Sequence, residues 1–119
     1  MPERPARILV VDDEAAIRQP VKWFLTNAGY FVDEAENGVE ALDLVKISRY
    51  DLIILDLRMP YLDGRQFLEA LRENRIRVPV LVMSAVETTE KLYLEQGRLI
   101  KTFSLSQLKA QVEKILSAS

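Results

Sequence analysis

The stretch DLIILDLRMPYLDG at residues 51–64 begins with a short apolar run, LIIL at 52–55, that ends in the acidic residue Asp56. A run of this length is too short for a helix and contains β-branched residues, so it predicts a buried strand. The same pattern occurs three more times, with ILVV before Asp12, VPVLVM before Ser84 and LI before Lys101. A weaker fifth strand is predicted at residues 30–34, after the helix-stop signal Asn-Ala-Gly.

Segments with apolar residues at helical spacing separate these runs. The clearest lies near the C-terminus, where Ser104 and Gln107 form a predicted capping box before a periodic apolar segment at residues 108–116. Alternating strands and helices, with strands that are apolar throughout, predict a parallel sheet covered by helices on both faces. The predicted fold class is therefore α/β with a doubly wound sheet.

The composition is that of one domain with its own core. The chain has 119 residues, of which 49% are apolar, and a formal net charge of −2 from 16 Lys and Arg against 18 Asp and Glu. The absence of Cys and His excludes thiolate metal sites and imidazole as a base, metal ligand or phosphoryl carrier. The chain has no run of basic residues, so we do not expect it to bind nucleic acid. It also has no apolar run of about 20 residues that could span a membrane, so we expect a cytoplasmic domain without a membrane partner.

A reactive polar side chain follows each of the four apolar runs that predict strands. These residues are Asp12 and Asp13, Asp56, Ser84, and Lys101. One Asp after a strand is an ordinary turn residue, but four such strand ends predict a site, because ligands of open α/β sheets bind at the carboxyl ends of strands. Clustered carboxylates repel each other by about 4 kcal/mol per pair at 4 Å, so the site needs cations. Lys101 supplies one of these cations. The second is expected to be Mg²⁺, because this ion prefers oxygen ligands.

Six motifs resemble the receiver domains of two-component response regulators, and the resemblance extends over essentially the whole chain. They are ILVVDDE at 8–14, NAGY at 27–30, AENGVEAL at 35–42, DLIILDLRMPYLDG at 51–64, VPVLVMSA at 78–85 and IKTF at 100–103. The fourth motif is the most specific, through Asp56, Met59, Pro60, Asp63 and Gly64. The resemblance implies a single receiver domain over residues 1–119 with a flavodoxin-like, five-stranded parallel sheet in the order 2-1-3-4-5.

The resemblance also implies an aspartyl-phosphate switch. Asp56 would accept a phosphoryl group from a histidine kinase or a phosphotransfer protein. Asp13 and Asp56 would bind Mg²⁺ directly, together with the backbone carbonyl of Arg58. Asp12 would hold the ion mainly through water.

Two further residues complete the implied site. Ser84 would hydrogen-bond the phosphoryl oxygens, and Lys101 would pair with one of them. Such a domain catalyses only its own phosphorylation and dephosphorylation, and it signals through a downstream effector or output domain. Many receivers form dimers or meet effectors through the face near the last strand, so a homodimer is a partner that the resemblance allows.

The sequence departs from the family between Ser84 and Lys101, which are only 17 positions apart. A helix sought at residues 88–96 should therefore be short, frayed or replaced by a loop. Arg98 stands where the resemblance implies an aromatic gate residue, and Tyr93 is the candidate substitute. Val86 stands where many relatives carry a polar residue, which predicts an altered rate of dephosphorylation.

These departures keep a second hypothesis open. The chain could be a pseudo-receiver that docks proteins without being switched by phosphorylation. A third hypothesis, a phosphatase that acts on external substrates, is less favoured, because such enzymes commonly need a second Asp two residues after the nucleophile. Here Leu57 and Arg58 follow Asp56.

Overall fold

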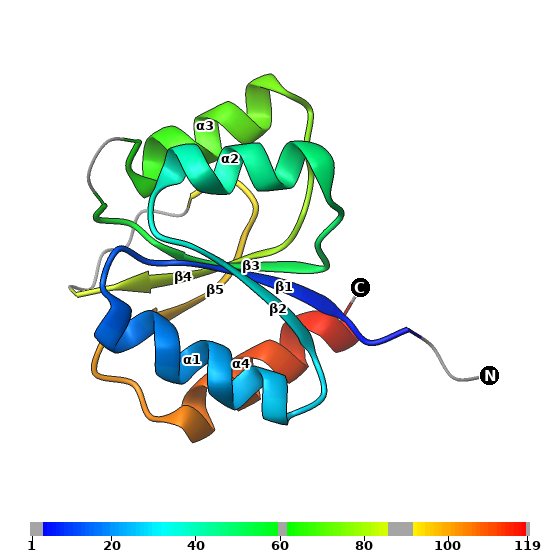
Figure 1. Cartoon of the computed structure of the whole chain (residues 1–119), viewed down its shortest axis with the longest axis vertical. Helices are drawn as coiled ribbons and strands as arrows, with labels where there is room; N and C mark the ends of the chain where they lie inside the picture. The colour runs from blue at the N-terminus through cyan, green and yellow to red at the C-terminus, as the bar shows by residue number, and fades with distance from the viewer. Residues whose placement is uncertain (1–3, 60–61, 86–91, 119) are drawn as a thin grey trace.

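The structure, a computed structural model, describes residues 4–59, 62–85 and 92–118. Its centre is one five-stranded parallel sheet in the order β2-β1-β3-β4-β5 (Figure 1). The strands are β1 (Arg7–Val11), β2 (Phe31–Ala35), β3 (Leu52–Asp56), β4 (Val80–Ser84) and β5 (Glu95–Ile100). The predicted α/β class and strand order are confirmed.

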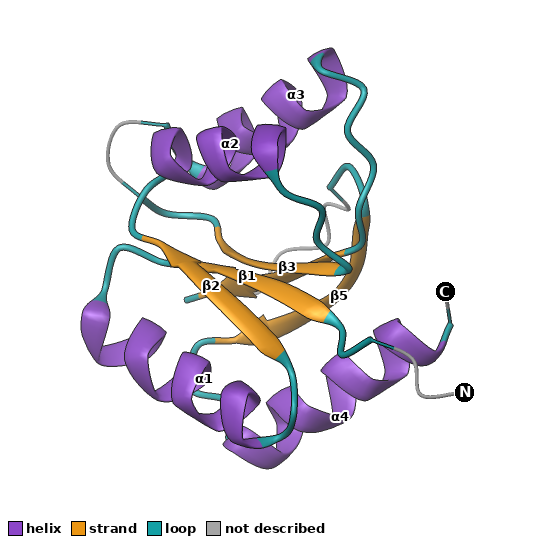
Figure 2. Ribbon diagram, turned by 45° about the vertical axis from the view of Figure 1, so that its right-hand side comes forward, coloured by secondary structure: helices purple, strands orange, loops and turns teal. Residues whose placement is uncertain are grey.

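Two pairs of helices cover the two faces of the sheet (Figure 2). One face packs against α1 (Ala15–Asn27) and α4 (Leu105–Ser117), and the other against α2 (Gly38–Ile47) and α3 (Gly64–Glu73). Because side chains alternate along a strand, each buried strand serves both cores. In β1, Ile8 and Val10 join the first core, whereas Leu9 and Val11 join the second.

The strand register aligns the predicted reactive residues along one edge of the sheet. Val11 pairs with Leu55, so Asp12 and Asp56 follow at the same level. Asp56 in turn pairs with Met83, and Ser84 pairs with Ile100, the residue before Lys101. Adjacent parallel strands therefore end together, although their residues are far apart in the sequence.

Local signals fix where the helices begin. The predicted capping box at Ser104 and Gln107 is present, and Asp63 and Gln66 form a second one at the start of α3. Each box satisfies backbone N–H groups that a helix leaves without a partner in its first turn. Among the described residues, no helix is both long and apolar enough to cross a bilayer.

The segment between β4 and β5 carries no helix over its described part. Residues 92–94 lie before β5, and Leu94 has a positive φ of 63°. The strand begins at Glu95. This start is earlier than predicted, because the apolar run before Lys101 is short. The expectation of a short or missing helix is confirmed for this part, while the prediction for Val86 concerns a residue outside the described ones.

Candidate functional site

Three buried or nearly buried charged groups meet at the carboxyl edge of the sheet. Asp12 follows β1 and is fully buried, and Asp56 is the last residue of β3 and is 2% exposed. Lys101 follows β5, and its ammonium lies 3.0 Å from Oδ2 of Asp56 and 3.3 Å from Oδ2 of Asp12. The fold thus brings together three of the residues that the sequence singled out.

Backbone groups hold one oxygen of each aspartate in place. The N–H of Glu14 donates to Oδ1 of Asp12 at 2.8 Å, and the N–H of Arg58 donates to Oδ1 of Asp56 at 3.2 Å. The other oxygen of each aspartate is buried and has no donor with hydrogen-bond geometry among the described residues. Their contacts with Lys101 are ion pairs, so both oxygens retain the capacity to bind a further cation.

A wider acidic cluster surrounds this pair. Oxygen atoms of Asp12, Asp13, Glu14 and Asp56 all lie within 4.8 Å of one another, and Asp13 and Glu14 are exposed to solvent. Glu14 also accepts a hydrogen bond from Lys101 at 2.9 Å. Four carboxylates against one ammonium leave a formal charge of −3. An open, oxygen-only, anionic cluster is the donor set that Mg²⁺ prefers, so these residues fit that ion.

Burial dominates the electrostatics of the aspartates. It raises the pKa of Asp56 to about 6, and the charge of Asp12 adds to the rise while Lys101 and the N–H of Arg58 oppose it. Burial likewise raises the pKa of Asp12 above its ordinary value. Burial would lower the pKa of Lys101, but its contacts with Glu14 and Asp56 raise that pKa overall. At neutral pH the ammonium stays charged and Asp56 is mostly ionised.

Ser84 and Arg58 are placed at the same edge through their backbones. Ser84 ends β4 and is 6% exposed, and its carbonyl accepts a hydrogen bond from the N–H of Lys101 at 2.8 Å. Arg58 lies in the loop after β3, and its contact with Asp56 is made by its N–H. The roles expected of the Ser84 hydroxyl and of the Arg58 carbonyl remain predictions.

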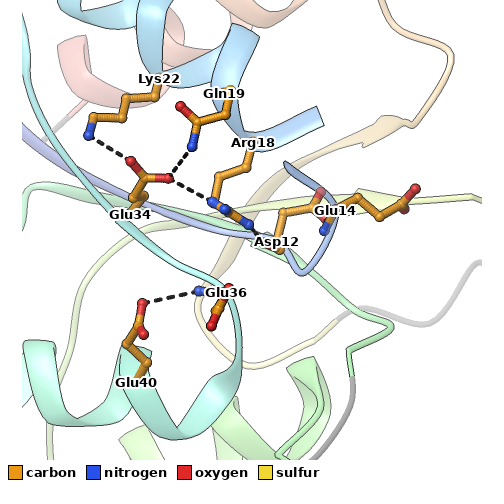
Figure 3. A network of polar contacts seen from close by, with 8 residues as sticks. All are labelled: Asp12, Glu14, Arg18, Gln19, Lys22, Glu34, Glu36 and Glu40. Carbon is orange, nitrogen blue, oxygen red and sulfur yellow. Dashed lines mark hydrogen bonds and ion pairs between the residues drawn. The ribbon is translucent and has the colours of Figure 1, made fainter. Parts of the chain in front are cut away.

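Two residues of this region were not assigned from the sequence. Glu14 joins the acidic cluster, and the third consecutive acidic residue after a predicted strand was the signal for it. Arg18 donates from Nη1 to the backbone carbonyl of Asp12 at 2.7 Å (Figure 3). A lone arginine in a helix gave no such signal, because its partner is a backbone atom.

Comparison with known proteins decides the family. The response regulator receiver domain family matches residues 8–113. The chain belongs to this family. Receiver domains of response regulators are parts of two-component systems and act in signalling rather than as enzymes on external substrates.

The receiver domain is similar to curated and solved relatives. It is 39% identical over 117 residues to the response regulator MprA of Mycobacterium sp. strain KMS, covering 94% of this chain and 51% of that protein. The chain therefore spans about half the length of the curated relatives that it matches. The receiver domain of Francisella response regulator 1452 shares 34% identity, with a TM-score of 0.87 and coverage of 95% of this chain and 98% of that one.

A second solved relative is described with a ligand. The response regulator TrrA of Thermotoga maritima, solved in complex with Mg²⁺ and BeF, shares 34% identity with this receiver domain. The TM-score is 0.82, and the match covers 92% of this chain and 98% of that one.

Arg98 and Tyr93, the two residues near β5 that the sequence analysis singled out, both have partners in the structure. Arg98 pairs with Glu95, with Nε 2.7 Å from Oε2 and Nη2 2.8 Å from Oε1. The guanidinium of Arg72 in α3 lies 5.9 Å from the ring centre of Tyr93, a cation–π contact. Tyr93 also packs against the core on the α2 and α3 side.

Proposed function

We propose that this receiver domain accepts a phosphoryl group on Asp56 from a phosphohistidine of a histidine kinase or phosphotransfer protein, and so switches a partner or output domain. One observation carries the proposal. The buried Oδ2 of Asp56 lies 3.0 Å from the ammonium of Lys101, inside a cluster of four carboxylates. A nucleophilic oxygen beside a fixed cation is the arrangement that phosphoryl transfer requires.

The chemistry needs no group that the chain lacks. An oxygen of ionised Asp56 attacks the phosphorus, a P–O bond forms, and the P–N bond to the donor imidazole breaks with its electron pair left on the nitrogen. Because a carboxylate is already deprotonated, no general base is needed, which agrees with the absence of His. Lys101 supplies positive charge where the phosphoryl oxygens carry negative charge, and the Ser84 hydroxyl would donate a hydrogen bond to them.

The proposal includes Mg²⁺ as the resident cation. Asp13 and Asp56 would bind it directly with the carbonyl of Arg58, and Asp12 would bind mainly through water. When bound, the ion neutralises carboxylate charge and polarises phosphoryl oxygens. The oxygen-only cluster around Asp12 and the TrrA relative described with Mg²⁺ and BeF support this assignment.

Intact mass spectrometry tests the proposal directly. The protein is incubated with Mg²⁺ and acetyl phosphate or a histidine kinase, and one added phosphoryl group is expected. The adduct should disappear in Asp56→Asn and persist in Asp43→Asn, which alters an exposed carboxylate on α2. Absence of an adduct with every donor, or an adduct that survives Asp56→Asn, would refute it.

The second candidate, a docking module that phosphorylation does not switch, is favoured by the region before β5. The described part of this region has no helix, and Arg98, at the position where the family resemblance implies an aromatic residue, is paired with Glu95. Measuring partner binding with and without beryllofluoride separates the two functions. Equal affinity would support the docking module, because a ligand that shifts no equilibrium cannot act as a switch.

We further propose the setting in which the domain works. Its partners would be a phosphohistidine donor and an effector or output domain, in the cytoplasm, with a homodimer as one assembly. The domain itself would not bind nucleic acid, consistent with its formal net charge of −2. Size-exclusion chromatography with and without beryllofluoride would reveal a phosphorylation-dependent dimer.

A further inference from the structure

A buried guanidinium ties the turn that carries the acidic residues to the rest of the fold. Arg18 lies in α1 and is only 9% exposed. Its Nη1 donates to the backbone carbonyl of Asp12, and its Nε donates to Oε1 of Glu34 in β2, both at 2.7 Å (Figure 3). One side chain therefore connects a helix, a strand and the turn after β1.

The carboxylate of Glu34 fixes the direction of this guanidinium. It accepts hydrogen bonds from Arg18, Gln19 and Lys22, each at 2.7 Å and all from α1 (Figure 3). The bonds from Lys22 and Arg18 hold the pKa of Glu34 below its ordinary value, so this anchor is ionised at neutral pH. A planar guanidinium held at one N–H has its other donors in fixed directions, and one of them meets the Asp12 carbonyl.

We infer that Arg18 is a positioning residue for the acidic cluster. By holding the carbonyl of Asp12, it sets the peptide between Asp12 and Asp13 and so the direction in which Asp13 and Glu14 present their carboxylates to Asp56. Groups just outside the ligand shell of a metal site commonly orient the ligands and affect ion affinity in this way. The inference depends on the proposed function only for the identity of the ion, Mg²⁺.

Whether Mg²⁺ binding weakens or strengthens when Arg18 is replaced shows whether Arg18 acts by positioning the acidic cluster or by its charge. Arg18 is a cation beside an anionic cluster, so by Coulomb's law alone its removal would strengthen Mg²⁺ binding. Positioning predicts the opposite, because a turn that is free to move spends less time with its carboxylates around the ion. Lys22 provides a matched control, since it binds the same Glu34 carboxylate but, among the described residues, has no hydrogen bond or ion pair with Asp12.

The experiment compares Arg18→Met with Lys22→Met in the whole chain. Both variants remove one positive charge and one donor to Glu34, and only the first removes the bond to Asp12. Mg²⁺ titration followed by NMR should give a dissociation constant about tenfold higher for Arg18→Met and an unchanged or lower one for Lys22→Met. Equal or tighter binding by Arg18→Met, or equal weakening in both variants, would overturn the inference.

A metal-free measurement keeps this test independent of the proposed function. The N–H of Glu14 donates to Asp12 within the turn, so its hydrogen exchange reports how well the turn is held. Exchange should accelerate in Arg18→Met and stay at the wild-type rate in Lys22→Met, and equal rates in both variants would contradict positioning. If the wild type does not bind Mg²⁺, the proposed metal site fails, while Glu14 exchange still decides the role of Arg18.

A conservative variant covers the case in which Arg18→Met does not fold. Arg18→Lys keeps the charge, but a single ammonium cannot reproduce the two directed N–H bonds to Glu34 and Asp12. We expect weaker Mg²⁺ binding and faster Glu14 exchange at unchanged net charge. Wild-type values for both in Arg18→Lys would mean that charge, not the directed bonds, is what matters.

Discussion

The ammonium of Lys101 lies 3.0 Å from Oδ2 of Asp56, although Asp56 ends β3 and Lys101 follows β5, two strands that are separated by β4 in the sheet. The same ammonium also contacts Asp12 and Glu14. Among the described residues it is the one basic side chain that forms ion pairs with the carboxylates of the acidic cluster, and it offsets one of four negative charges. Its removal should therefore affect ion binding and phosphoryl transfer in opposite directions.

Lys101→Met should bind Mg²⁺ about threefold to tenfold more tightly than the wild type, because a competing cation is lost. Its phosphorylation by acetyl phosphate should be slower by roughly 10²-fold, because a charge that stabilises the transferring group is lost. Mg²⁺ titration and the rate of adduct formation measure the two effects. Lys109→Met, at an exposed position on α4, should change neither. A parallel change in both quantities would contradict the assigned role of Lys101.

Asp56→Asn should stabilise the metal-free protein at neutral pH by about 2 kcal/mol. The pKa of Asp56 is raised from 3.8 to about 6, so folding favours the protonated carboxyl. Between those values the unfolded chain loses its proton first, and wild-type stability falls as pH rises. Urea unfolding at pH 4 and pH 7.5 should show a small difference between the proteins at the lower pH and the full difference at the higher one.

Mg²⁺ provides the control for this stability prediction. Saturating Mg²⁺ should stabilise the wild type more than Asp56→Asn, since the ion binds an ionised carboxylate better than an amide. The gap between the two proteins should therefore narrow when the ion is added. An unchanged gap would indicate that Asp56 is not part of the ion site.

Gly64→Ala should destabilise the fold by about 1–3 kcal/mol. A Cβ at Gly64 would lie 2.7 Å from the carbonyl oxygen of Asp56 and 2.7 Å from Cα of Leu57, both backbone atoms that cannot move aside cheaply. Gly97→Ala is the matched comparison, because its Cβ would meet the end of the flexible Gln111 side chain at the same distance. Thermal unfolding should show the larger loss for Gly64→Ala, and the reverse order would contradict this account of the loop after β3.

Glu34→Gln should make stability less dependent on pH in the acid range. Hydrogen bonds from Lys22 and Arg18 lower the pKa of Glu34, so it contributes stability above its ordinary value of 4.5 that is lost as pH falls through the lower, folded-state value. The variant should be less stable by about 1 kcal/mol at neutral pH, and the difference should shrink toward pH 3. Urea unfolding over this range measures both, and a difference that grows on acidification would contradict the ion pairs.

Much of the fold could be predicted from local sequence. The runs before Asp12, Asp56 and Ser84 predicted three central strands, because central parallel strands are buried on both faces and must be apolar. The edge strand β5 was predicted only at its last residues. Its earlier residues, Glu95 to Arg98, include no large apolar side chain, and an edge strand tolerates this, so only pairing with β4 shows that they are a strand.

The acidic site, too, could be predicted only in part from the sequence. The sequence by itself determined that acidic, hydroxyl and basic residues end the strands, and parallel pairing requires such ends to lie at one edge of the sheet. Only the tertiary structure decided that Glu14 joins the cluster and that Arg18 holds the Asp12 carbonyl. Those contacts depend on side-chain direction and on burial against other elements, which local residue patterns do not encode.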